Sequence, residues 1–245
     1  MKFNREYFVH YYDCDTNLRL HITSLLRYFE DIALLHSEDA GVGLNYYHTN
    51  KIAWLLYKWD IIIHNYPHFT DSVNIITEPH GYSKFYAYRT FDVRGKNNEQ
   101  LITGNSIWFL VDTSIRRPTK ITEELYGYYN VPMEDRIELK LDEIGTVNRI
   151  DNQKEFFVRQ SDIDTNDHVN NIKYVEWALE AIPTDILKTC VLKRLKVIYK
   201  KETHFGKKIK TIVEINEESS GIICNHKIMD EDVEVCLLET HWTKQ

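Results

Sequence analysis

A short stretch beyond the middle of the chain concentrates side chains that can hold charge or move protons. Between residues 162 and 171 it contains carboxylates, amides and an imidazole: Asp162, Asp164, Asp167, Asn166, Asn170, Asn171 and His168. A carboxylate within reach of a water molecule can act as a general base, and an amide can donate a hydrogen bond to a developing negative charge. The stretch therefore predicts that this half of the chain carries groups able to do chemistry.

This stretch begins with the pattern Asp-x-Asp-Thr-Asn at Asp162–Asn166. A second copy of the pattern lies near the start of the chain at Asp13–Asn17. Two more matches follow the copies in the same order: His68–Phe69 with His204–Phe205, and Ser106–Trp108 with Thr240–Trp242. Matches in one order along the chain predict a degenerate internal duplication. The first copy continues with mostly apolar residues, so we expect it to shape a turn without taking part in chemistry.

The spacing of acidic and amide residues in each copy resembles that of a calcium-binding loop. An EF-hand also needs Gly at its sixth position and Glu at its twelfth. Counted from Asp162, these positions hold Asp167 and Lys173, so calcium is excluded, and we expect neither a metal nor a cofactor. The remaining alternative is purely structural, because Asp and Asn stabilise turns and helix N-termini by bonding to nearby backbone groups.

Each copy stands between a predicted strand and a predicted helix. Aromatic-rich strand patterns precede the copies at residues 7–9 and 156–158. Apolar stripes with helical spacing follow them, at Leu25, Leu26, Tyr28, Phe29, Ile32 and Leu35 and at Ile172, Val175, Ala178, Leu179 and Ile182. Thr23 or Ser24 is the expected N-cap of the first helix and an Asn that of the second, and Gly41 and Pro183 lie beyond the helix ends.

Alternation with period two predicts further strands at residues 53–63, 72–78, 84–93, 101–111, 192–199, 208–215, 222–229 and 234–242. One helix beside a run of antiparallel strands, twice over, is an α+β architecture. We therefore predict an N-terminal domain at residues 1–135, which includes the start of a connection at 118–152, and a C-terminal domain at 136–245.

The net charge of −7 argues against nucleic-acid binding, which needs a cationic surface. The segment from Lys193 to Lys210 is instead strongly basic, because Glu202 is its one acidic residue. It is either a solvated strand face or a docking surface for an acidic partner. The cysteines lack metal-ligand spacing, and no apolar targeting or membrane-spanning run occurs, so we expect a cytoplasmic protein that does not insert into membranes.

The stretch Phe157–Trp177 resembles the signature of acyl-acyl carrier protein (acyl-ACP) thioesterases, the plant fatty-acid-terminating enzymes and their bacterial relatives. The similarity extends over nearly the whole chain and is most specific at Asn166–Asn171. It implies a tandem (double) hotdog fold, in which an antiparallel sheet wraps a long central helix in each half. The same hexapeptide recurs loosely in single-hotdog thioesterases, so an acyl-CoA thioesterase stays open, as does a non-catalytic acyl-binding hotdog protein.

The resemblance also implies catalytic residues. The family's Asp-x-Asn-x-His triplet falls on Asp164, Asn166 and His168, and a second motif contributes Glu202. The next position, a cysteine in plant enzymes, holds Thr203, which is a poor nucleophile without an evident activating base. We therefore expect direct attack by water, with either acid as general base. The implied reaction is hydrolysis of acyl-ACP to free fatty acid and holo-ACP in fatty acid biosynthesis.

The implied partner is the acidic acyl carrier protein, which a cationic rim beside the site would attract. The acyl chain needs an apolar pocket, and the first domain with its aromatic stripe is the expected lining. The residues expected to contact the substrate are Asn170, Asn171, Thr203, Lys200, Lys201, Tyr28 and Trp54. A double hotdog contains both halves in one chain, so a monomer can be complete, and a homodimer stays possible.

Overall fold

The computed structural model describes residues 2–131 and 138–245, and the chain forms two compact units. Unit 1 comprises Met1–Tyr57 and Ile63–Leu141, and unit 2 comprises Lys58–Ile62 and Asp142–Gln245. The predicted domain boundary between residues 135 and 136 lies outside the described residues. Lys58–Ile62 lies in the first half of the sequence but belongs to unit 2. The predicted division into two continuous domains does not include this assignment.

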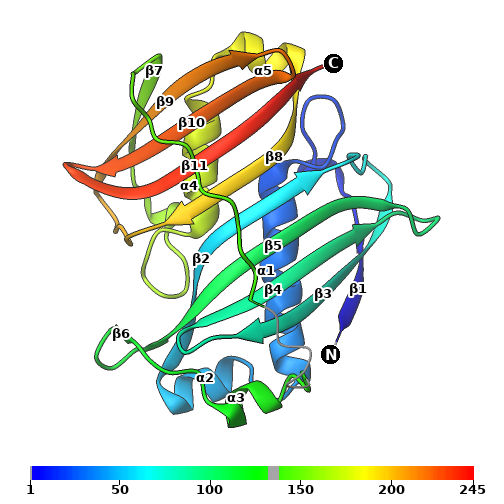
Figure 1. Ribbon diagram of the computed structural model, residues 1–245, viewed down its shortest axis with the longest axis vertical. Coiled ribbons are helices and arrows are strands. Elements are labelled where there is room, and N and C mark those ends of the chain that lie inside the picture. Colours follow the sequence, from blue (N-terminus) through cyan, green and yellow to red (C-terminus); the bar gives the residue numbers. More distant parts are fainter. Residues whose placement is uncertain (1, 132–137) are drawn as a thin grey trace. The chain divides into compact units, whose positions relative to one another are not determined.

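Unit 1 is an antiparallel sheet with one long helix. Its strands pair in the order β1 (Phe3–Phe8), β3 (Ser72–Tyr82), β4 (Tyr86–Arg94) and β5 (Gln100–Asp112), and β6 (Arg117–Pro118) pairs with β5. The helix α1 (Ile22–Asp39) packs against β1 and β3 (Figure 1). Two short helices, α2 (Leu44–Asn50) and α3 (Glu123–Gly127), also belong to the unit.

The helix α1 buries a stripe of large apolar side chains: Ile22, Leu25, Leu26, Phe29 and Ile32. The predicted N-cap, Thr23 or Ser24, is wrong. His21 precedes the helix, and its Nδ1 accepts the Thr23 N–H at 3.3 Å, which satisfies one of the free donors of the first turn. Gly41, beyond the helix end, has a φ of +80°, a conformation that glycine adopts without strain.

Unit 2 repeats this arrangement with a shorter helix. Its strands pair in the order β8 (Cys190–Tyr199), β11 (Val233–Lys244), β10 (Gly221–Asp230), β9 (Lys208–Glu218) and β7 (Asn152–Phe157). Lys58–Ile62, part of β2 (Ile52–Ile63), pairs with β8 at the other edge. The helix α4 (Asn171–Glu180) packs against β7, β9, β10 and β11, and α5 (Thr184–Thr189) follows. Each unit is thus a helix against an antiparallel sheet, as predicted.

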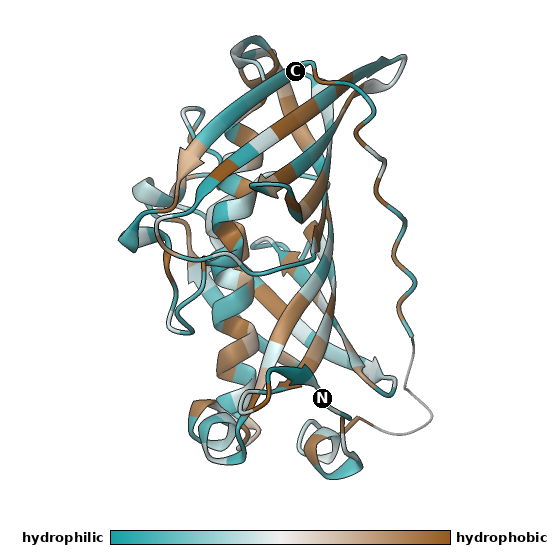
Figure 2. Cartoon of the chain, turned by 90° about the vertical axis from the view of Figure 1, so that its left-hand side faces the viewer, coloured by the Kyte–Doolittle hydropathy of each residue, from teal (hydrophilic) through white to brown (hydrophobic). Residues whose placement is uncertain are grey.

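The predicted strands are confirmed as β2 to β5 and β8 to β11, while α2, α3, α5 and β6 were not predicted. Hydrophobic and hydrophilic residues alternate along the strands (Figure 2). In α4 the predicted stripe runs past the helix end, because the helix stops at Glu180 and Ile182 is buried in the turn before α5. Within residues 2–131 and 138–245, no helix combines the length and the apolarity that crossing a membrane requires.

An extended segment, residues 142–151, runs over the face of the unit 2 sheet opposite α4 (Figures 1 and 2). Carboxylates of the sheet hold its backbone. Glu239 of β11 accepts the Gly145 N–H at 2.8 Å, and Glu214 of β9 accepts the Asn148 N–H at 2.6 Å. This part of the predicted connection is therefore bound to unit 2.

Replacing Glu239 with Gln should destabilise the protein at neutral pH. Burial raises the pKa of Glu239, but hydrogen bonds from His241, Lys196 and the Gly145 N–H outweigh it and lower the pKa from 4.5 to about 2. Because the folded state has the lower pKa, the stabilisation is complete above pH 4.5 and is lost as the pH falls towards 2. We expect E239Q to lose about 2 kcal/mol of unfolding free energy at pH 7, measured by urea denaturation.

The matched control is Glu217→Gln, which removes an exposed carboxylate from β9. It should change the unfolding free energy by less than about 0.5 kcal/mol. The difference between E239Q and the parent should shrink as the pH falls below 4 in the same measurement. A difference that is the same at pH 7 and pH 3 would contradict the assigned role of Glu239.

Candidate active site

The stretch that the sequence singles out forms the turn between β7 and α4. A 3-10 turn at Gln160–Asp162 follows β7, and the buried carboxylate of Asp162 accepts the Arg159 N–H at 2.8 Å. The Asp162 carbonyl accepts the Asn170 N–H at 2.9 Å. Asn170 caps α4, since its Oδ1 accepts the Ile172 N–H at 2.9 Å, and the predicted Asn N-cap is confirmed. Asp162 and Asn170 therefore shape the loop.

Asp164 also stabilises this loop. Its Oδ1 accepts the Asn166 N–H at 2.8 Å and the His168 N–H at 3.4 Å, and its own N–H donates to the His168 carbonyl at 2.8 Å. Asp167 has a φ of +64°, in the left-handed region that Asp and Asn adopt more readily than most residues. One carboxylate oxygen of Asp164 is thus occupied by backbone N–H groups, which leaves this acid less available to abstract a proton.

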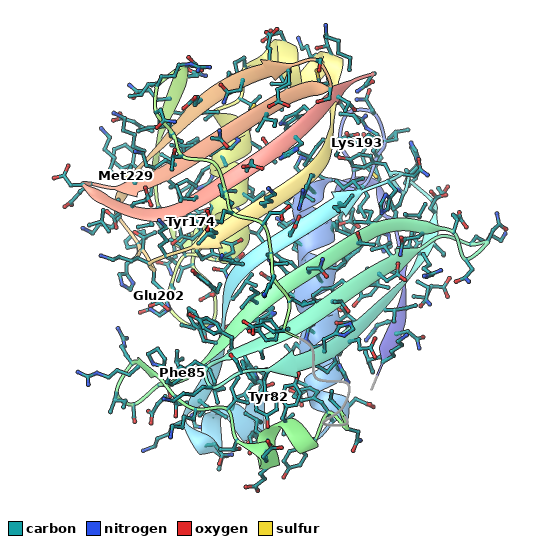
Figure 3. The ribbon with its side chains drawn as sticks, viewed as in Figure 1. Tyr82, Phe85, Tyr174, Lys193, Glu202 and Met229 are labelled. Carbon is teal, nitrogen blue, oxygen red and sulfur yellow. The ribbon has the colours of Figure 1, made fainter. Side chains whose placement is uncertain are left out.

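The loop holds His168 against Glu202, which lies in the segment after β8. His168 Nε2 is 3.1 Å from Glu202 Oε2, and the side chains are 18% and 44% exposed. The Val169 N–H donates to the Thr203 carbonyl at 3.1 Å, so the two segments lie side by side. Figure 3 labels Glu202 in this segment and Tyr174 on α4. A partly exposed carboxylate paired with an imidazole can take a proton from water.

Two groups that the sequence did not predict contact His168 and the neighbour of Glu202, Thr203. The His204 ring packs against the His168 ring, with the centroids 5.1 Å apart. Asp230, at the end of β10, accepts the Thr203 hydroxyl at 2.6 Å, and Lys207 Nζ lies 3.9 Å from the same carboxyl group. Asp230 ends an ordinary alternating strand, so no pattern in the sequence marked it.

The remaining predicted residues of unit 2 lie around the same loop. Asn166 is exposed, and the Asn171 carbonyl accepts the Tyr199 hydroxyl at 3.1 Å. Roles of Asn166, Asn170, Asn171 and Thr203 towards a substrate stay predictions. In the described ranges, no group of three or more His, Cys, Asp or Glu side chains is arranged to hold a metal ion.

Much of the basic run around Glu202 is paired within the unit. The surface ion pairs are Lys200 with Glu234, Lys207 with Glu231 at 3.1 Å, and Lys208 with Glu155 at 2.9 Å. Lys196 is buried and pairs with Glu239 at 2.8 Å, so it belongs to no docking surface. Lys201, next to Glu202, is exposed. The cationic rim is therefore weaker than the count of basic residues predicts.

The matching loop of unit 1 has the same backbone conformation. Asp15 Oδ1 accepts the Asn17 and Arg19 N–H groups at 2.8 and 3.0 Å, as Asp164 does in unit 2. Leu18 has a φ of +58° at the place of Asp167. The duplication seen in the sequence therefore extends to the hydrogen bonds of the loop.

The side chains of that loop differ from those in unit 2. The Leu20 N–H donates to the Pro67 carbonyl at 2.8 Å, as the Val169 N–H does to the Thr203 carbonyl, so Arg19 and Tyr66 occupy the places of His168 and Glu202. Arg19 Nε donates to Asp15 Oδ2 at 3.0 Å, and its guanidinium lies 5.4 Å from the centre of the Tyr66 ring. Burial raises the pKa of Tyr66. A guanidinium and a buried phenol do not form a base for neutral pH.

Tyr28 and Trp54, the predicted lining of an acyl pocket, both belong to unit 1. The Tyr28 hydroxyl donates to Asp13 Oδ2 at 2.7 Å, and its ring stacks on Tyr7 with centroids 4.8 Å apart. Trp54 packs against a buried cluster that contains Leu110 and Tyr126. Core packing accounts for these contacts, and the role of both residues in acyl binding stays a prediction.

Comparison with known proteins points to one group of enzymes. The family models described as "Acyl-ACP thioesterase N-terminal domain" and "Acyl-ACP thioesterase C-terminal domain" match residues 1–129 and 146–244. A chloroplastic dodecanoyl-[acyl-carrier-protein] hydrolase of Cinnamomum camphora is 24% identical over 98% of this chain and 67% of its own. A chloroplastic palmitoyl-acyl carrier protein thioesterase of Arabidopsis thaliana is 24% identical over 99% and 64%. The chain thus spans about two thirds of their length.

Solved structures agree with this grouping. A protein described as an oleoyl thioesterase from Lactobacillus plantarum superimposes with a TM-score of 0.93 and 26% identity, covering 100% of this chain and 96% of its own. The 12:0-ACP thioesterase of Umbellularia californica superimposes with a TM-score of 0.88 and 22% identity, covering 100% and 94%, which supports the fold alone.

Proposed function

Because the chain belongs to the acyl-ACP thioesterase family, we propose that it hydrolyses the thioester of acyl-ACP by attack of a water molecule that Glu202 activates. The family models match both halves of the chain. The observation that carries the residue assignment is the 3.1 Å contact between His168 Nε2 and the partly exposed carboxylate of Glu202. The products are a free fatty acid and holo-ACP.

In this mechanism Glu202 is the general base and His168 orients it. Glu202 is the more exposed partner, while Asp164 is engaged by the backbone of its own loop. The sequence left the choice between the two acids open, and these contacts favour Glu202. Asn166, exposed in the loop between Asp164 and His168, supplies an amide donor for the oxyanion.

The steps balance without a cofactor. Glu202 takes a proton from water as the water oxygen bonds to the thioester carbon, and the carbonyl oxygen becomes an oxyanion. When the oxyanion reverts to a carbonyl, the carbon–sulfur bond breaks and the electron pair leaves on sulfur. The proton held by Glu202 then passes to the thiolate of the phosphopantetheine arm, which regenerates the carboxylate.

Lys201 is the basic residue of this region that is best placed to attract an acidic carrier, because it is exposed and adjacent to Glu202. We expect K201Q to lower kcat/KM on acyl-ACP roughly fivefold at low salt, since complementary charge speeds encounter. Hydrolysis of the corresponding acyl-CoA should change less. Thiol release from both carriers, followed at several salt concentrations, measures the difference.

The matched control is Lys154→Gln, an exposed lysine of β7 that pairs with Glu180 at 3.2 Å. It should leave kcat/KM on both carriers unchanged. Equal rates on the two carriers that persist when Lys200, Lys201, Lys207 and Lys208 are all neutralised would instead identify an acyl-CoA thioesterase. Absence of thiol release from every acyl carrier would identify a non-catalytic acyl-binding protein.

The cytoplasmic location and the oligomeric state are further proposals. A monomer carries Glu202 and His168 in one unit, so the proposed reaction does not require a second copy. Sedimentation of the purified protein tests the oligomeric state, and fractionation of the source cells tests the location.

A further inference from the structure

Two side chains of the segment Glu202–His204, those of Glu202 and His204, contact His168. Glu202 Oε2 lies 3.1 Å from His168 Nε2, and the His204 ring packs on the His168 ring at 5.1 Å. The residue between them, Thr203, is 1% exposed and points into the unit. The placement of both His168 neighbours therefore depends on how Thr203 is held.

Thr203 is held from three directions. Its carbonyl accepts the Val169 N–H at 3.1 Å, and its backbone also forms a hydrogen bond with the phenol of Tyr174 on α4. Its hydroxyl donates to Asp230 Oδ2 at 2.6 Å. The contacts with Val169 and Tyr174 are made by the backbone of residue 203. The carbonyl that accepts the Val169 N–H is present whatever the residue type. The third requires both a hydroxyl at position 203 and an acceptor at position 230.

The acceptor is itself fixed. Asp230 ends β10, and its carboxylate is mostly covered. While Oδ2 accepts the Thr203 hydroxyl, Oδ1 is buried and has no hydrogen-bond partner among the described residues, and Lys207 Nζ lies 3.9 Å from it. Burying a carboxylate costs free energy unless the carboxylate accepts hydrogen bonds, and two apolar side chains would fill the same space without that cost. The bond between Asp230 and Thr203 therefore points to a role other than stability.

Unit 1 offers an internal comparison. The place of Thr203 there is taken by Pro67, whose carbonyl accepts the Leu20 N–H at 2.8 Å. Proline has neither a hydroxyl nor an N–H. The backbone contact is thus common to both units, whereas the bond from the side chain occurs in the unit that pairs Glu202 with His168.

We infer that Asp230 is a positioning residue for thioester hydrolysis, which holds the Glu202 carboxylate against His168 through the hydroxyl of Thr203. This inference rests on the proposed function. It also assigns Thr203 a positioning role and not that of a nucleophile. The Thr203 hydroxyl donates to Asp230 inside the unit, whereas the Glu202 carboxylate is partly exposed to solvent.

The experiment compares Thr203→Val, Thr203→Ser and Asp230→Ala in acyl-ACP hydrolysis. We expect T203V and D230A to lower kcat up to about 100-fold, because small displacements of a catalytic group have effects of this size. KM should stay within about twofold, since the substrate contacts are unchanged. T203S keeps the hydroxyl and should retain kcat within about threefold. The double variant T203V/D230A should be no slower than D230A, because both changes break one contact.

The pattern of kinetic effects separates positioning from general loss of structure. A fall in kcat with KM retained, together with recovery of kcat in T203S, is the result expected for positioning. Glu231→Gln, next to Asp230 and exposed, is the control for kcat. Thermal unfolding of each variant checks that it is folded.

Three outcomes would overturn the inference. One is wild-type kcat in both T203V and D230A. Another is a loss in T203V as large as that in a Glu202 variant, with acylated Thr203 found by mass spectrometry. The last is a T203S enzyme as slow as T203V. A wild-type protein that hydrolyses no acyl carrier would instead overturn the proposed function.

Discussion

Replacing Glu202 with Gln is expected to lower kcat for acyl-ACP hydrolysis roughly 1,000-fold, with KM changed less than about threefold. Gln keeps the size of the side chain and can still bond to His168, but it cannot take a proton from water. Because Glu202 is 44% exposed, the loss of its charge should have little effect on folding. Stopped-flow detection of free thiol, with acyl-ACP as substrate, measures both constants.

The companion variant is His168→Ala, which removes the partner that orients Glu202. Its kcat should fall by a similar factor, and the double variant should be little slower than either single one, because the two residues act as a unit. Glu231→Gln changes another exposed carboxylate of unit 2 and should retain wild-type kcat. A Glu202→Gln enzyme with more than about a tenth of wild-type kcat would exclude Glu202 as the base.

Replacing Asp162 with Ala is expected to cost about 4 kcal/mol of unfolding free energy, the largest effect on stability that we predict. Asp162 is 1% exposed, and its carboxylate accepts the Arg159 N–H at 2.8 Å and its guanidinium at 3.0 Å. Burial raises the pKa of Asp162, but the bonds with Arg159 and the nearby charge of Lys173 outweigh it, so the pKa lies below its usual value. The alanine variant leaves these donors without their acceptor.

Urea denaturation at pH 7 measures this loss. The control is Asp167→Asn, which changes an exposed residue of the same loop to another residue that tolerates its φ of +64°. It should change the unfolding free energy by less than about 0.5 kcal/mol. Equal stability of the two variants would show that the carboxylate of Asp162 does not hold the loop.

The sequence predicted the fold to the level of its repeated elements. Alternating residues marked the long strands, and the Asn170 cap and the stripe from Ile172 to Ala178 marked α4. Local patterns of this kind reflect burial on one face, which is visible in a single sequence. The N-cap His21 was missed because His is a rare cap, and the short helix α2 was missed because it buries no residue of its own. The transfer of Lys58–Ile62 to unit 2 is a pairing between distant strands, which no local pattern contains.

For the candidate site, the sequence proposed Asp164, Asn166, His168 and Glu202 as catalytic residues but did not distinguish between the two acids as the base. Asp164 and Glu202 were equal candidates for the base until the structure showed Asp164 bonded to its own loop and Glu202 to His168. Asp230 was missed altogether, because its contact with Thr203 joins residues on different elements. Contacts between side chains distant in sequence depend on strand register, and a one-residue shift would remove them.

The two copies of the Asp-x-Asp-Thr-Asn loop show how one backbone can serve two purposes. In both units the carboxylate of the second Asp of the pattern accepts the backbone N–H of the Asn, at 2.8 Å from Asn17 to Asp15 and at 2.8 Å from Asn166 to Asp164. In unit 1 the side chain that follows, Arg19, returns to that Asp. In unit 2 the corresponding residue, His168, turns to Glu202 on another segment. The same loop backbone thus directs an Arg side chain to its own Asp in unit 1 and a His side chain to Glu202 in unit 2.

In the proposed reaction, Glu202 and His168 of unit 2 activate the water that cleaves acyl-ACP. The most direct test is a single-turnover experiment in which enzyme in excess is mixed with acyl-ACP and free thiol is recorded for the wild type and for Glu202→Gln. We predict one equivalent of holo-ACP from the wild type and at least about a 100-fold slower release from the variant. No release from the wild type, or equal rates for both proteins, would contradict the claim.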